Sequence, residues 1–73
     1  MASILIEPFE GEGINLFSVQ TRLERYGIEI SHSSTNRNYI QIFYTGDLPP
    51  VAQEYLESLK KEKRAKKVSY TKT

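Results

Sequence analysis

The chain has 73 residues and no cysteine, and 38% of its residues are hydrophobic and 26% charged, which fits one small domain and excludes a disulfide framework or a thiolate metal site. No segment approaches the roughly 18 apolar residues of a membrane helix, and the N-terminus lacks the features of a signal peptide, so we expect a soluble, cytoplasmic protein. The net charge of +1 conceals a net −5 in residues 1–59 and a net +6 in residues 60–73, an asymmetry that predicts a C-terminal segment meeting an anionic partner.

The first expected element is a strand over residues 3–9. In this segment Ile4 and Ile6 alternate with residues that would point to the other face of a sheet. Pro8 cannot donate a ladder hydrogen bond, so the strand should end there or lie at an edge of the sheet. Residues 10–13 predict an acidic loop with two glycines.

Residues 15–26 predict a helix. Asn15 is a suitable N-cap, because its side-chain oxygen can accept a hydrogen bond from the first turn, and Gly27 can end the helix in a left-handed conformation. Arg22 and Arg25 lie in the last turns, where the helix dipole favours cations. The apolar stripe of this helix comprises Leu16, Val19, Leu23 and Tyr26.

A hairpin should follow the first helix. Residues 28–32 alternate strictly between apolar and polar, which predicts a half-buried strand. Residues 33–38 are all polar and predict the turn. Residues 39–44 are rich in β-branched and aromatic side chains, and they predict the strongest strand of the chain.

A second helix is expected after residue 47. Asp47 is a candidate N-cap, and a proline is tolerated in a first turn. From Pro49 onward the apolar residues recur at helical spacing as far as Leu59. Because that stripe stops at Leu59, residues 60–73 predict a basic tail that is partly helical or disordered and dispensable for folding.

These elements predict an α+β fold. The order is β-α-β-β-α, and the first two strands should run parallel with residues 39–44 between them, antiparallel to both. Two helices would cover one face of a three-stranded mixed sheet, which makes a two-layer sandwich. We expect a compact domain over residues 1–59, a tail over residues 60–73, and a monomer.

The residues offer little for catalysis or for cofactor binding. His32 stands between Ser31 and Ser33, but neighbours in a strand point to opposite faces, and no third group is placed to orient the pair. The G-x-G formed by Gly11 and Gly13 is flanked by glutamates, whose negative charge repels phosphate. We therefore expect no enzyme, no cofactor and no metal site.

Two groups of residues are candidates for binding a partner protein. The acidic loop could pair with a basic protein surface, and Tyr39 and Phe43 share one strand face. Because the helices can cover only one face of the sheet, these aromatics would lie on the open one, or in a small second hydrophobic cluster. The candidate protein-contact residues are Glu7, Glu10, Glu12, Arg22, Arg25, Tyr39 and Phe43.

The basic segment is the candidate for contact with nucleic acid or with an acidic surface. Six cations in eight residues could neutralise several phosphates, and the strand aromatics could stack on bases. The alternative is a solvated helix end, in which lysines favour solubility and complement the helix dipole. The candidate residues are Lys60, Lys61, Lys63, Arg64, Lys66 and Lys67.

Over its full length, from the run Met1 to Ile6 to the basic end, the chain resembles small phage-encoded proteins that bind host RNA polymerase, such as the transcription regulators of Xanthomonas phages. The resemblance rests on size, on the lack of catalytic residues and on this overall run. It implies a non-enzymatic regulator in the host bacterial cell that binds RNA polymerase subunits near the RNA exit region. Such a protein would displace the sigma subunit, inhibit host initiation and act as an antiterminator. The tail could then approach nascent RNA or DNA.

Overall fold

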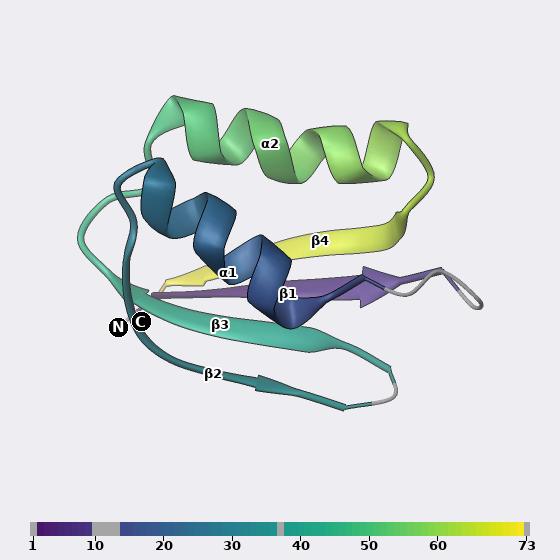
Figure 1. The fold of residues 1–73 in the computed structure, drawn as a ribbon, viewed down its shortest axis with the longest axis horizontal. Coiled ribbons are helices and arrows are strands. Elements are labelled where there is room, and N and C mark those ends of the chain that lie inside the picture. The colour runs from purple at the N-terminus through teal and green to yellow at the C-terminus, as the bar shows by residue number, and fades with distance from the viewer. Residues whose placement is uncertain (1, 10–13, 37, 73) are drawn as a thin grey trace.

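The structure, a computed structural model, describes residues 2–9, 14–36 and 38–72. Across these residues, two helices lie against one face of a four-stranded antiparallel sheet and leave its other face uncovered (Figure 1). The elements are, in chain order, β1 (Ala2–Pro8), α1 (Leu16–Arg25), β2 (Glu29–Thr35), β3 (Ile40–Thr45), α2 (Pro50–Lys61) and β4 (Ala65–Lys72). The predicted α+β class is confirmed. Within the described ranges, no helix is long and apolar enough to cross a membrane.

The strands lie in the order β2-β3-β1-β4, and each neighbouring pair is antiparallel. Strands β1 and β2 therefore run parallel on either side of β3, as the sequence predicts, in the split β-α-β arrangement. The predicted three-stranded mixed sheet has too few strands and is not mixed, whereas the predicted antiparallel pairing of residues 39–44 with both neighbours is confirmed. The described residues include a further strand, β4, which lies beside β1, and every neighbouring pair in the sheet is antiparallel.

The segment expected to be a tail is part of the fold. Lys60 and Lys61 complete α2, and residues 65–72 form β4, which pairs with β1 along its length. Ala65 and Val68 are buried under the helices, at 1% and 8% exposure. The lysines of this segment interrupt the apolar pattern because β4 is an edge strand with one open face, where charge is tolerated.

The helix α1 agrees with the prediction at both ends. The side-chain Oδ1 of Asn15 accepts a hydrogen bond from the backbone N–H of Ser18 at 3.2 Å. Gly27 has a φ of 99°, a left-handed conformation that glycine adopts without steric cost. Arg22 and Arg25 occupy the last turn, as expected.

The boundaries of β2 and α2 differ from the prediction. β2 continues through Ser33, Ser34 and Thr35, because pairing with β3 outweighs the turn preference of serine. The Ser33 hydroxyl donates to Oε1 of Gln20 on α1 at 3.0 Å. At the start of α2, Pro49 is the N-cap residue and makes no side-chain capping bond, so Asp47 is not the cap.

The hydrophobic core lies between the sheet and the helices. Tyr70 on β4 lies outside this core and is 38% exposed, yet burial raises the pKa of its phenol to about 12, and the nearby Glu57 and Tyr44 add to the rise. The largest of the fully buried side chains, each at most 2% exposed, are Ile4, Ile6, Val19, Leu23, Ile42 and Leu56.

Candidate functional site

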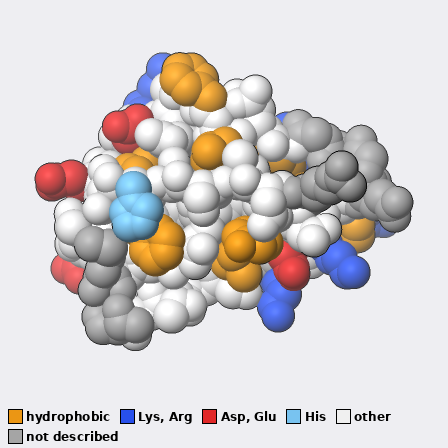
Figure 2. Space-filling model, turned by 90° about the horizontal axis from the view of Figure 1, so that it is seen from below, with side chains coloured by type: hydrophobic (Ala, Val, Ile, Leu, Met, Phe, Trp, Pro, Cys, Tyr) orange, Lys and Arg blue, Asp and Glu red, His pale blue; other side chains and the backbone are white. Residues whose placement is uncertain are grey.

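The face of the sheet opposite the helices, called the open face here, carries polar, aromatic and charged side chains. Figure 2 shows this face, with the single histidine (pale blue) beside hydrophobic side chains (orange). The strand register arranges its residues in rows that cross the sheet. The first row holds His32, Phe43, Ser3 and Thr71, and the second holds Ser34, Gln41, Leu5 and Ser69. In a third row, Glu7 of β1 lies opposite Lys67 of β4.

Two aromatic rings stack on the open face. The rings of His32 and Phe43 have centroids 4.3 Å apart and planes within 16° of parallel. A register shift between Ile30 and His32 makes Ser31 an extra residue and sets His32 opposite Phe43. The predicted position of Phe43 on an uncovered face is confirmed, whereas alternation alone gives no sign of the shift that brings His32 beside it.

Tyr39 takes a different position from the one predicted. It precedes β3, and it is half-buried rather than part of the strand. Its backbone N–H donates to Oδ1 of Asn36 at 3.0 Å, and its carbonyl accepts from the N–H of Asn36 at 3.0 Å. Tyr39 therefore helps to close the β2–β3 hairpin.

The predicted cations do not form one surface. Lys60 and Lys61 lie on α2, where the Nζ of Lys60 is 2.8 Å from a carboxylate oxygen of Glu57. Arg64 lines a groove between the helices. These three cations therefore belong to the helical side of the molecule, away from the open face.

Lys63, Lys66 and Lys67 lie at the end of the sheet where α2 turns into β4. Lys67 faces Glu7 across the β1–β4 pair, and Lys66 is the extra residue where the register shifts. All three lysines are exposed. Of the three, Lys67 is placed on the open face by the strand register.

Lys63 has an unusual backbone conformation. It follows the C-cap residue of α2 with a φ of 59°, at a position that helices usually give to glycine. A side chain in this left-handed region costs roughly 1–2 kcal/mol. Glycine would adopt the same conformation without this cost.

We expect Lys63→Gly to raise stability while it weakens the binding of a polyanion. Relief of the left-handed strain stabilises the fold, and the extra entropy of glycine in the unfolded chain offsets part of this gain. The free energy of unfolding should therefore rise by about 0.5–1 kcal/mol. Urea denaturation and a single-strand binding assay check the two effects. Lys63→Ala is the matched control: it should weaken binding equally without the gain in stability. Unchanged binding in both variants would contradict a role for the charge.

Of the three acidic candidates, the structure describes one. Glu7 is half-buried at the end of β1, opposite Lys67. Glu10 and Glu12 lie outside the described residues. Among the residues that are described, no group of three His, Asp or Glu side chains is arranged to hold a metal ion.

A groove separates α1 and α2 on the side remote from the open face. It has a volume of about 400 Å³, and Arg22, Tyr26, Tyr55 and Arg64 are among its lining residues. Nη1 of Arg22 donates to the Tyr26 hydroxyl at 3.3 Å, and its guanidinium carbon lies 5.5 Å from the centre of the Tyr55 ring. Burial raises the pKa of Tyr55, although Arg22 and Arg64 act in the opposite direction.

Exposed hydrophobic side chains flank this groove. Phe17 on α1 is 75% exposed, and Val51 on α2 is 45% exposed. Phe17 and Arg25 line a second hollow of about 280 Å³, which shares Arg22 with the groove. Arginines and aromatics at the surface are enriched where proteins bind other proteins.

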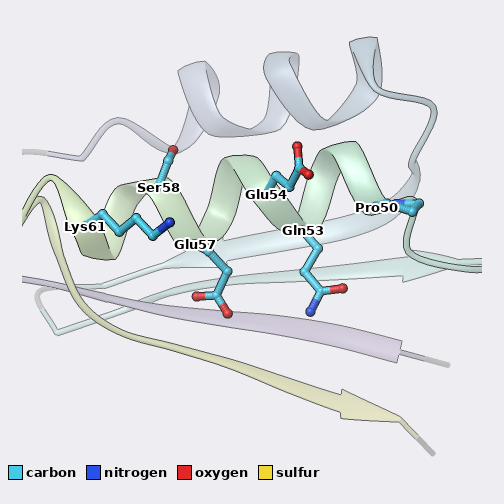
Figure 3. A pocket seen from close by; sticks show the side chains of 6 residues that line it. All are labelled: Pro50, Gln53, Glu54, Glu57, Ser58 and Lys61. Atoms are coloured by element: carbon cyan, nitrogen blue, oxygen red, sulfur yellow. The ribbon is translucent and has the colours of Figure 1, made fainter.

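A further hollow of about 520 Å³ runs along the outer surface of α2. Gln53 and Glu57 project from one side of the helix and Glu54 from the other (Figure 3). Its lining residues are Pro50, Gln53, Glu54, Glu57, Ser58 and Lys61. Because all of them come from one helix and carry charges of both signs, this hollow offers no chemistry that selects a ligand.

Comparison with protein-family models, with curated proteins and with solved structures finds no match to this chain. The resemblance to phage regulators of RNA polymerase therefore stays a prediction.

Proposed function

We propose that this chain is a non-enzymatic binding protein that takes single-stranded nucleic acid on the open face of its sheet. The stacked rings of His32 and Phe43, 4.3 Å apart on a face that the helices leave uncovered, are the observation that carries the proposal. Aromatic rings on an exposed sheet are the usual platform for unstacked bases.

The surroundings of the rings support the same function. Phe43 and Leu5 both lie on the open face, outside the hydrophobic core, and both are half-buried, so each presents part of its apolar surface to a ligand. Lysines at the end of the sheet can neutralise phosphates. A fold alone does not decide function, so the proposal rests on these side chains.

The salt dependence of binding tests this proposal. We expect a fluorescent RNA or DNA single strand to bind with a slope of log association constant against log salt of about −2, if Lys63, Lys66 and Lys67 each meet one phosphate. The double variant Lys66→Gln with Lys67→Gln should make the slope shallower, at about −0.7. Lys60→Gln is the control, because Lys60 is paired with Glu57 on α2. Lack of binding at low salt would refute the proposal.

A second candidate is the regulator of RNA polymerase that the resemblance implies. The groove between α1 and α2 favours it, because an arginine, two tyrosines and the exposed Phe17 lie together there. Such residues commonly dominate the binding energy at protein interfaces. In this hypothesis the helical side would bind the polymerase, and the open face would remain available for RNA.

A pull-down from bacterial lysate tests this second function. We expect the chain to retain RNA polymerase subunits, and we expect Phe17→Ala combined with Arg22→Ala to abolish the retention, since hot-spot residues often cost at least about 2 kcal/mol each when truncated. The variant Lys66→Gln with Lys67→Gln should retain the subunits. Failure of the unmodified chain to retain polymerase would rule this function out.

A further inference from the structure

His32 is the only histidine of the chain, and it lies at the outer end of the stacked pair. It belongs to β2, an edge strand, so among the described residues no further strand lies beyond it. Its side chain is exposed, and Figure 2 shows the ring at the surface of the open face. With centroids 4.3 Å apart and nearly parallel planes, the two rings lie face to face. Phe43 therefore covers one face of the imidazole, and the other face and the ring edge can meet a ligand.

The groups around His32 are compatible with both charge states of its ring. Nδ1 lies 3.4 Å from the Ser31 hydroxyl, which can donate to the neutral ring or accept from the protonated one. The negative face of the Phe43 ring attracts an imidazolium. Strand β3, which pairs with β2, carries one titratable side chain, Tyr44, and this phenol is buried on the covered face. On β2 itself, the exposed Glu29 shares the open face with His32, and its carboxylate also attracts a positive charge.

The second ring nitrogen of His32 is available to a ligand. Among the described residues, no hydrogen bond engages Nε2. Protonation makes both ring nitrogens donors and places a positive charge beside the stacking platform. Lysine and arginine keep their charge through the neutral and mildly acidic range, whereas histidine ordinarily changes charge within it. His32 is therefore the cation of the open face that pH can switch.

We infer that protonation of His32 regulates the binding of single-stranded nucleic acid at the open face, an inference that rests on the proposed function. The neutral ring takes part in stacking alone. The imidazolium still stacks, and it adds a charge-assisted hydrogen bond to a phosphate beside the stacked base. A polyanion binds the more positive surface more tightly, so the affinity rises as the pH falls. By linkage, the bound strand favours the protonated form of His32 to the same extent.

The affinity for a labelled oligothymidylate without a terminal phosphate tests the inference, because neither its bases nor its internal phosphates titrate in this range. At about 50 mM salt, the unmodified chain should bind roughly 5- to 10-fold tighter at about pH 5.5 than at about pH 8, with a salt slope steeper by about 0.7. His32→Phe keeps a stacking ring that cannot titrate, so its affinity should change less than about twofold between the two pH values. His32→Arg is charged at both, and at about pH 8 it should bind as tightly as the unmodified chain does at about pH 5.5.

The outcomes separate the inference from the function on which it rests, once circular dichroism at both pH values has shown that each variant is folded. Equal affinity of the unmodified chain at the two pH values would overturn the regulation and leave single-strand binding intact. A pH dependence that persists in His32→Phe would overturn the assignment to His32. Absence of binding at both pH values in low salt would refute the proposed function itself.

Discussion

A chain that ends at Leu59 is expected to lose its folded structure. Removal of β4 takes Ala65 and Val68 out of the core and uncovers Ile4 and Ile6 on β1, which have no exposed surface in the intact fold. Burial of each of these two isoleucines contributes about 1.5–3 kcal/mol. A domain of this length has a total stability of about 4–11 kcal/mol, so the loss removes most or all of it.

Circular dichroism and the dispersion of amide proton resonances measure this result. A chain that ends at Tyr70 is the control, because it keeps Ala65 and Val68 and should stay folded. The full-length variant Lys66→Gln with Lys67→Gln should also stay folded, since both lysines are exposed. A native-like spectrum of the chain that ends at Leu59 would contradict the structural role of β4.

Replacement of Phe43 with alanine is expected to weaken single-strand binding by about 5- to 150-fold. Loss of one stacked base costs about 1–3 kcal/mol, and His32 would lose its ring partner as well. Phe43 lies outside the hydrophobic core, so the fold should be retained. Fluorescence anisotropy with a labelled oligonucleotide measures the change in affinity.

The matched control for this variant is Phe17→Ala. Phe17 is also a phenylalanine with an exposed ring, but it lies on α1, on the opposite side of the molecule from the open face. We expect Phe17→Ala to leave the affinity unchanged and Phe43→Trp to restore it, because any large aromatic ring can stack on a base. A loss of affinity in Phe17→Ala, with no loss in Phe43→Ala, would place the binding site on the helices instead.

Local signals predicted the parts of the fold that depend on a few adjacent residues. Asn15 and Gly27 define the ends of α1, and the β-branched and aromatic run of β3 identifies the central strand. The relation between β1, β2 and β3 follows from the handedness of a β-α-β connection. The open position of Phe43 follows from alternation along β3.

The remaining features depend on pairing between distant parts of the chain. β4 is hidden in a lysine-rich segment, and only its pairing with β1 explains why Val68 and Tyr70 lie on the covered face. The alternation of valine, serine, tyrosine and threonine over residues 68–71 was the available signal. The stack of His32 on Phe43 depends on an extra residue in β2, which no local pattern reveals.

The central claim is that single-stranded nucleic acid binds the open face of the sheet. Titration of the isotope-labelled chain with a short oligonucleotide, followed by amide chemical shifts, tests it most directly. Binding at the open face predicts that the largest changes occur at His32, Gln41, Phe43 and Lys67, with little change along α1. Changes concentrated at Phe17, Arg22 and Tyr55, or no changes at low salt, would contradict it.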